Sequence, residues 1–122
     1  MYSYQHLEIW QKSVDLVENI YQLTRRFPDE EKYGLVSQMR RSAISIPSNI
    51  AEGKLRGSDK ELLRFLRISF GSVGELETQA IIAKRLFPHL SREISDTSSE
   101  IKVIIKMLIT FMRKIHTDAK FS

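Results

Sequence analysis

The sequence contains no cysteine, which excludes disulfide bridges, thiolate nucleophiles and cysteine-ligated zinc or iron–sulfur sites. It also lacks an apolar run near the roughly 18 residues that a membrane-spanning helix needs. The first residues show neither the basic start nor the apolar stretch of a secretory signal. Strand-like alternation and glycine-rich phosphate-binding loops are missing as well. These absences predict a soluble, cytoplasmic protein without a membrane segment, a metal or a cofactor.

The chain has 122 residues, of which 42% are apolar and 28% are charged. This length suits one domain with one hydrophobic core, so residues 1–122 are expected to form a single unit. The formal net charge is +4. A moderate positive charge is compatible with an anionic partner, and the position of the charges matters more than their total.

Apolar residues recur at helical spacing from about Leu7 to Phe27 and form two adjoining stripes. This segment is therefore predicted to be a helix with two apolar faces. Pro28 and Asp29 end it, because proline restricts the residue before it and aspartate favours a new helix start. A second helix is expected from about Glu30.

Pro47 falls inside this second helix. An interior proline costs about 3 kcal/mol in an isolated helix, so either a kink or a break is expected between Ser45 and Pro47. A kink is favoured, because Ile50 stays in phase with the inward apolar stripe. Gly53 and Gly57 predict the end of the helix and the turn that follows it.

The segment from Ser58 to Glu61 has the pattern of a capping box and predicts the start of a third helix. That helix is expected to reach about Phe87. A fourth amphipathic helix follows after Ser91, and the tail from Thr117 to residue 122 is expected to fray. Four helices joined by short connections predict an all-α, antiparallel four-helix bundle.

Neither a catalytic nor a metal-binding constellation is recognisable. The three histidines, His6, His89 and His116, lie far apart and lack the paired spacing of metal ligands or of a catalytic triad. Glu75 and Glu77 are two residues apart, so they point to different sides of a helix. The protein is therefore predicted not to be an enzyme.

Basic residues are concentrated in the middle of the chain. Seven lie between Arg40 and Arg67 against three acidic residues, whereas the first 31 residues carry six acidic and three basic ones. A basic face of this kind suits the phosphates of RNA or DNA, although a simply solvated face has the same appearance. The candidate nucleic-acid-binding residues are Arg40, Arg41, Lys54, Arg56, Lys60, Arg64, Arg67, Lys102, Lys106 and Arg113.

Small residues are concentrated between Ser69 and Gly74, in the middle of the third helix. Each glycine there costs about 1 kcal/mol relative to alanine, so close approach of another backbone is expected. Several apolar residues also fall outside the inward stripes, which predicts either self-association or a core reached from two sides within a monomer. The candidate contact residues are Ile44, Ala51, Ile68, Gly71, Gly74 and Ile82.

Three segments carry a resemblance to a known family. The longest, from Tyr33 to Gly53, reads YGLVSQMRRSAISIPSNIAEG. It is supported by LEIWQK from Leu7 and by LRISFGSVGELETQ from Leu66. These strings resemble the four-helix-bundle proteins encoded in intervening sequences of bacterial 23S ribosomal RNA genes.

The resemblance implies an up-down-up-down bundle that assembles into a homo-oligomer, with a ring of five as the expected form. It brings no catalytic motif, and the family's biochemical role is not established. A distant similarity of fold links the family to the basic accessory protein of diversity-generating retroelements, but fold alone does not carry function. The main hypothesis is a non-enzymatic oligomeric module that binds RNA or DNA. The alternative is a protein-interaction scaffold that binds no nucleic acid.

Overall fold

The computed structural model describes the backbone of residues 3–121 and the side chains of residues 3–117. Within that part of the chain it contains four α-helices and three short 3-10 helices, and no strand. The α-helices are α1 (Glu8–Thr24), α2 (Leu35–Leu55), α3 (Asp59–Leu86) and α4 (Ser91–Phe121). The 3-10 helices are η1 (Tyr4–His6), η2 (Asp29–Glu31) and η3 (Pro88–Leu90). The predicted all-α four-helix bundle is confirmed.

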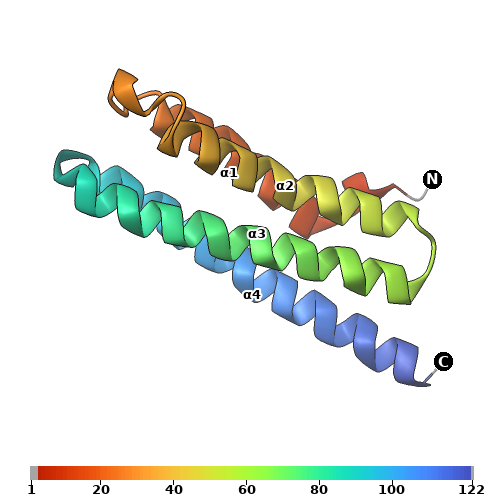
Figure 1. The fold of residues 1–122 in the computed structure, drawn as a ribbon. Coiled ribbons are helices and arrows are strands. Elements are labelled where there is room, and N and C mark those ends of the chain that lie inside the picture. The colour runs from red at the N-terminus through yellow and green to blue at the C-terminus, as the bar shows by residue number, and fades with distance from the viewer. Residues whose placement is uncertain (1–2, 122) are drawn as a thin grey trace.

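Each α-helix packs against two others, in the cyclic order α1, α2, α3, α4. Asn19 in the second half of α1 binds Glu100 in the first half of α4, and Ser45 of α2 binds Ser72 of α3. Both chain ends and the α2–α3 connection lie at one end of the bundle, and the other two connections lie at the opposite end (Figure 1). Neighbouring helices therefore run antiparallel.

One buried stripe from each helix forms the core. Leu16 and Ile20 of α1, Met39 of α2, Leu66 of α3 and Ile101 of α4 all belong to this core, and each has at most 1% of its surface exposed. The stripes follow the helical periodicity of the sequence, because residues three and four apart share one side of a helix. The predicted stripes of α2, α3 and α4 are buried apart from Leu35, Ile105, Phe111 and Met112, which are half-buried.

The two apolar stripes of α1 have different environments. The stripe that contains Ile9, Leu16 and Ile20 is buried in the core. The other stripe consists of Trp10, Val14, Val17 and Tyr21, and it is only half-buried. The second apolar face that the sequence predicts for α1 is thus partly open to solvent.

α2 begins later than expected. The sequence predicts a start near Glu30, but residues 29–31 form η2, and α2 begins at Leu35 after Gly34. The Glu31 side chain accepts a hydrogen bond from the Leu35 amide at 3.4 Å. This carboxylate satisfies one of the free amides at the helix start, so the cap lies one turn further along the chain.

α2 continues without a break through Pro47, which is buried. Side chains add donors to the carbonyls just before the proline. Asn49 Nδ2 donates to the Ser45 carbonyl at 2.8 Å, and Ser69 Oγ of α3 donates to the Ile46 carbonyl at 2.7 Å. The first of these hydrogen bonds lies within α2, and the second ties α2 to α3. Both support the segment around Pro47, where the sequence predicts either a kink or a break. The break, which the sequence favours less than a kink, is excluded.

Gly53 does not end α2, which continues to Leu55. Gly53 is buried against Leu62 and Phe65 of α3. Only Gly57 forms the turn, at a φ of 82° that other residues rarely adopt. The close approach of two backbones that the sequence predicts for Gly71 and Gly74 therefore occurs at Gly53 instead.

The third helix begins as predicted. Ser58 Oγ accepts a hydrogen bond from the Glu61 amide at 3.2 Å. The other half of the capping box is replaced, because the Glu61 carboxylate binds Arg64. The fourth helix begins at Ser91 as expected but extends through Phe121, beyond the end expected near Thr117. The side chains of residues 118–122 lie outside the described part of the chain.

Candidate nucleic-acid interface

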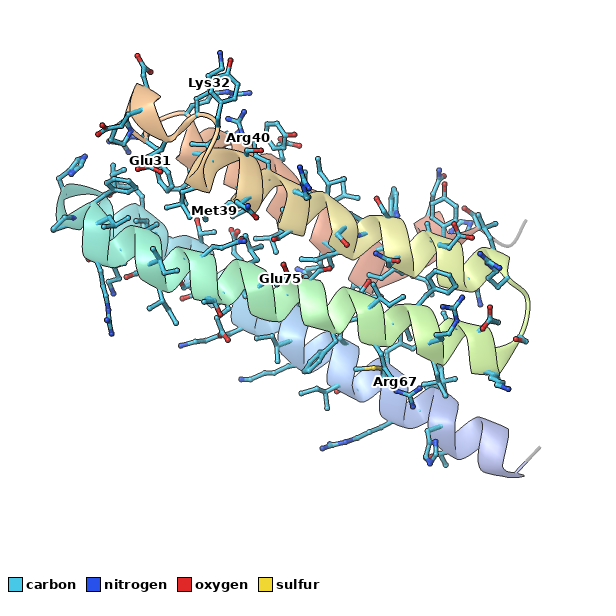
Figure 2. The ribbon with its side chains drawn as sticks, viewed as in Figure 1. Glu31, Lys32, Met39, Arg40, Arg67 and Glu75 are labelled. Carbon is cyan, nitrogen blue, oxygen red and sulfur yellow. The ribbon has the colours of Figure 1, made fainter. Side chains whose placement is uncertain are left out.

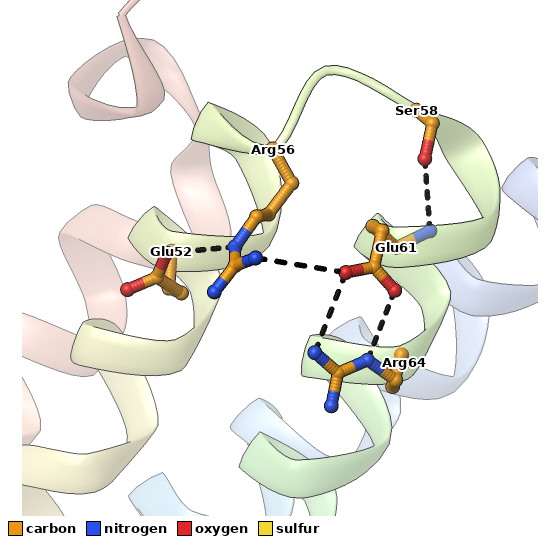
Figure 3. Close-up of polar contacts among 5 residues, drawn as sticks. All are labelled: Glu52, Arg56, Ser58, Glu61 and Arg64. Carbon is orange, nitrogen blue, oxygen red and sulfur yellow. Dashed lines mark hydrogen bonds and ion pairs between the residues drawn. The ribbon is translucent and has the colours of Figure 1, made fainter.

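An ion-pair cluster occupies the end of the bundle at the α2–α3 connection (Figure 3). Arg64 binds both oxygens of the Glu61 carboxylate, through Nε at 2.9 Å and Nη2 at 3.3 Å. Arg56 donates from Nε to Glu52 at 3.0 Å, and its Nη1 lies 3.9 Å from Glu61. Glu61 thus links the first turn of α3 to the end of α2, and Arg56 and Arg64 are largely neutralised.

The same two arginines lie over an aromatic ring. The guanidinium carbon of Arg64 is 4.4 Å from the centre of the Phe65 ring, and that of Arg56 is 5.1 Å away. Phe65 is buried, with 8% of its surface exposed. The ring therefore holds the arginines against the protein and is not accessible for stacking on a base. The expectation that few acids neutralise the basic cluster is wrong for Arg56 and Arg64.

The pairing of Glu61 with Arg64 shifts the pKa of both groups. The hydrogen bond from Arg64 is the main cause that lowers the pKa of Glu61 from its ordinary value of 4.5. The same bond raises the pKa of Arg64. Arg64 is exposed and Glu61 is only half-buried, so we expect this pair to contribute little to the stability of the fold.

Three cations of the predicted cluster remain available. Lys54, Lys60 and Arg67 are exposed, and none forms an ion pair among the side chains of residues 3–117. Lys54 is in the last turn of α2, and Lys60 is in the first turn of α3. Arg67 extends from α3 on the side of α4 (Figure 2).

The other predicted cations, Lys102, Lys106 and Arg113, belong to α4. A hollow of about 330 Å³ separates α3 from α4 and has Ile81, Lys84 and Lys102 among its lining residues. Arg67 precedes Ile81 by two heptads, and it therefore lies on the same side of α3. Lys60 precedes Arg67 by one heptad, and Arg113 follows Lys102 by three turns, so they continue this side of α3 and α4. We call this surface the α3–α4 basic face: Lys60, Arg67, Lys84, Lys102 and Arg113. The remaining predicted cation of α4, Lys106, lines a hollow between α1 and α4 instead. Lys84 was not among the residues predicted from the sequence. Its position in the last turn of α3 is the only local feature that marks it as a candidate.

Arg40 has a structural role that sequence reasoning did not reveal. Its Nε donates to Thr24 Oγ1 at 2.9 Å, and its guanidinium lies 4.3 Å from the centre of the Tyr21 ring. These contacts join α2 to the last turns of α1. The next residue, Arg41, is exposed and forms no ion pair in the described part of the chain.

The predicted contact residues do not lie on one surface. Ile44 and Ala51 follow Arg40 by one and three turns, so they lie on the side of α2 that contacts α1. Ile68 and Ile82 belong to the outer side of α3, where they are 41% and 44% exposed. A Cβ added at Gly71 or Gly74 would meet nothing within 4 Å. The close approach predicted at these glycines is therefore absent from the described chain.

An apolar surface forms where α1 and α2 meet. The half-buried stripe of α1 lies beside Ile44, which is 42% exposed, and Leu55, which is 64% exposed, continues the same side of α2. We call this surface the α1–α2 apolar face: Trp10, Val14, Val17, Tyr21, Ile44, Ala51 and Leu55. The sequence shows the apolar residues of α1 and those of α2 separately. The helical pattern does not show that the two sets lie next to each other.

The histidines remain apart, with His6 in η1, His89 in η3 and His116 in α4, and all three are exposed. Among the described residues, no group of three or more His, Asp or Glu side chains could hold a metal ion. In the same part of the chain, none of the helices combines the length and the apolar character that a membrane span requires.

Comparison with known proteins identifies the family. Residues 5–110 match the 23S rRNA-intervening sequence proteins. The chain belongs to this family. The match covers all of α1, α2 and α3 and most of α4. The resemblance of the sequence motifs to this family is thereby confirmed, whereas a search of curated proteins found no match.

A crystal structure with the same fold is known in Bacteroides thetaiotaomicron. It is described as a protein of unknown function from the S23 ribosomal protein family. The two chains share 20% sequence identity, and the match covers 85% of this chain and 97% of the other, with a TM-score of 0.76. At this identity the similarity supports the bundle fold of the intervening sequence family and says nothing about activity.

Proposed function

We propose that this 23S rRNA-intervening sequence protein is a non-enzymatic, homo-oligomeric module that binds RNA or DNA. One observation carries the proposal: exposed cations without ion pairs are concentrated on the α3–α4 basic face and at the neighbouring end of α2. Lys60 and Arg67 of α3 and Lys54 of α2 are the central members. Each phosphate that such a cation neutralises releases counterions, which gives affinity at low salt.

The proposed contact is with the phosphate backbone. The ring of Phe65 is buried under Arg56 and Arg64 and offers no stacking surface, and Phe70, three residues after Arg67, has 37% of its surface exposed. Phosphate contacts position a nucleic acid without reading its sequence. We therefore expect binding that depends strongly on salt and tolerates changes of sequence.

Self-association is proposed to use the α1–α2 apolar face. Exposed apolar side chains on a helix pair are a frequent basis for contacts between subunits. Ile44 and Leu55 supply the most exposed apolar area, and Val14 and Val17 continue it on α1. The ring of five implied by the family resemblance is the expected assembly. This face lies away from the α3–α4 basic face, so assembly leaves the cations accessible.

The second candidate function is a protein-interaction scaffold that binds no nucleic acid. It is favoured by the isoleucines on the outer side of α3, Ile68 and Ile82, which lie outside both surfaces defined above. Gly71 between them offers room for a partner to approach the helix backbone. In this case the cations would only keep the bundle soluble.

A salt titration tests the main proposal. Fluorescence anisotropy would follow binding of labelled, mixed-sequence RNA and DNA over a series of salt concentrations. Affinity should fall steeply as salt rises. Replacing Lys60 and Arg67 by glutamine should reduce the slope of log affinity against log salt by about one unit for each phosphate that the variant no longer neutralises.

The matched control removes two cations at the opposite end of the bundle, Arg25 and Lys32, which are also exposed. Replacing these by glutamine changes the net charge equally and should leave the slope almost unchanged. Equal effects of both double variants would show that only net charge matters. Absence of wild-type binding at low salt would contradict the proposal and favour the scaffold.

A further inference from the structure

A groove follows the seam between α1 and α4. Two hollows of about 370 Å³ each share Asn19 and Glu100 in their walls. A third hollow, of about 500 Å³, lies further toward the end of α4 and has Ile9 and Phe111 among its lining residues. The three hollows extend along α4 from Glu93 to beyond Phe111, which corresponds to roughly 30 Å at about 1.5 Å per residue.

The first two hollows are acidic. Within them Arg26 forms an ion pair with Glu93 at 2.7 Å, and Asn19 Nδ2 lies 2.9 Å from both oxygens of Glu100. Asp15, Glu18 and Asp96 form no ion pair among the described side chains. The charged lining residues are the carboxylates Asp15, Glu18, Glu93, Asp96 and Glu100 and the cations Lys12 and Arg26. This local negative charge stands on a chain with a net charge of +4.

The third hollow is mainly apolar. Leu7 and Ile9 of the α1 side face Met107 and Phe111 of α4, and all four pack on the core. Lys106 and Lys114 lie on the α4 wall, and Glu8 lies on the opposite wall. The groove thus changes along its length from an acidic to an apolar surface.

The walls of the groove favour a helix as its occupant. Both walls are α-helices whose backbone groups are bonded within the helix, so the groove presents side chains and no free sheet edge. An extended segment would leave its own amides and carbonyls without partners here. A helix satisfies its backbone internally and matches a straight groove between two helices.

We propose that the α1–α4 groove binds an amphipathic, basic α-helix of a partner protein. Lysines or arginines on the first turns of this helix would lie over Asp15, Glu18 and Asp96. Apolar residues on its later turns would lie over Leu7 and Phe111, which are half-buried. Charge complementarity selects this partner and excludes nucleic acid, because the unpaired carboxylates repel phosphates. The groove lies outside the α3–α4 basic face, so this proposal does not depend on the proposed nucleic-acid binding.

The test uses a synthetic helical peptide of about 20 residues, long enough to span the groove. It carries lysines on one face of its first three turns and leucines on the same face of its last two. Isothermal titration calorimetry measures its affinity for the full-length protein at low salt. The triple variant Asp15→Asn, Glu18→Gln, Asp96→Asn should bind this peptide roughly tenfold more weakly.

The matched control neutralises three exposed carboxylates outside the groove, Asp29→Asn, Glu30→Gln and Glu75→Gln, and should bind as the wild type does. A peptide of the same composition in scrambled order should bind more weakly, because its lysines and leucines no longer follow the two parts of the groove. Nucleic-acid affinity of the groove variant should not fall.

Three results would overturn the proposal. The wild type could fail to bind the helical peptide at low salt. The control variant could weaken binding as much as the groove variant, which would indicate nonspecific attraction. Light scattering could show that the groove variant changes the oligomer, which would assign the groove to a second copy of this chain.

Discussion

The backbone of α2 meets Phe65 so closely at Gly53 that a Cβ added to Gly53 would lie 2.8 Å from the Phe65 Cβ. Real Cβ atoms essentially never approach so closely, and the Leu62 carbonyl oxygen would lie 3.3 Å away on the same side. The obstacle is the base of a side chain and a backbone atom, neither of which can rotate away. The contact fixes the distance between α2 and α3 next to their connection.

Gly53→Ala should therefore destabilise the protein. Overpacking of this kind costs on the order of 1–3 kcal/mol, which exceeds the roughly 1 kcal/mol gained when alanine replaces glycine in a helix. Gly74→Ala is the control, because a Cβ there meets nothing within 4 Å. It should raise the free energy of unfolding by about 0.5–1 kcal/mol. Chemical denaturation of both variants measures the difference, and equal shifts of the same sign would refute the close contact.

Ser69 supplies a second link between α2 and α3. Its hydroxyl is fully buried and donates to the Ile46 carbonyl at 2.7 Å. Ser69→Ala should lower the free energy of unfolding by about 0.5–1.5 kcal/mol, the usual net contribution of such a bond. Ser99→Ala removes an exposed hydroxyl that bonds within its own helix, and it should change the stability by less than about 0.5 kcal/mol. A stability of Ser69→Ala equal to that of the wild type would show that the bond contributes nothing.

The fold follows from the sequence because helical periodicity marks every buried stripe. What the sequence could not supply is how the helices face each other. A glycine near a helix end suggests a stop, and only the position of α3 reveals that Gly53 is a contact point. The glycines at 71 and 74, in contrast, face open space. Helical periodicity shows which residues share a side of a helix, but it does not show which residues of another helix pack against that side.

The sequence predicts which cations belong to the candidate site, but it does not predict which of them form ion pairs. The cations of α3 and α4 are visible as stripes in the sequence, and antiparallel packing brings them together. Glu52 and Glu61 lie in the same stretch of sequence as the cations. Only the structure shows that they form ion pairs with Arg56 and Arg64 and not with Lys60. The acidic groove joins Asp15 to Glu100, which are far apart in the chain. No local signal connects them.

The ion pair of Glu61 and Arg64 predicts a response to pH. The hydrogen bond from Arg64 lowers the pKa of Glu61 below 4.5 in the folded protein. The pair therefore favours the folded state above the pKa of the unfolded chain, and this contribution is lost as the pH falls through the lowered value. In Arg64→Gln the pKa of Glu61 should rise toward 4.5, as an NMR titration of its side-chain carboxyl would show. Arg113→Gln should not move it, and an unchanged value in Arg64→Gln would contradict the pairing.

The oligomer test separates two apolar surfaces. Replacing Ile44 and Leu55 by glutamine should reduce the mass in solution, because both residues belong to the α1–α2 apolar face. Replacing Ile68 and Ile82 by glutamine should not, although these are similarly exposed isoleucines on α3. Light scattering at micromolar concentration measures the mass. A wild-type mass of 14.2 kDa, that of a single chain, would contradict self-association altogether.

The last prediction compares two neighbouring arginines that the sequence assigns to the same role. Arg40 binds Thr24 and lies against the Tyr21 ring, whereas Arg41 is exposed. Arg40→Gln should lower the free energy of unfolding by about 1–2 kcal/mol, because it removes a charged hydrogen bond and a cation–π contact between α1 and α2. Arg41→Gln should change it by less than about 0.5 kcal/mol. Chemical denaturation gives the stability of each variant, and the salt titration with RNA or DNA gives its affinity. Arg40→Gln should keep the wild-type salt slope, since its guanidinium is already engaged. A reduced stability of Arg41→Gln would contradict the description of Arg41 as an exposed side chain without structural contacts. A reduced salt slope of Arg40→Gln at unchanged stability would show that Arg40 contacts the nucleic acid.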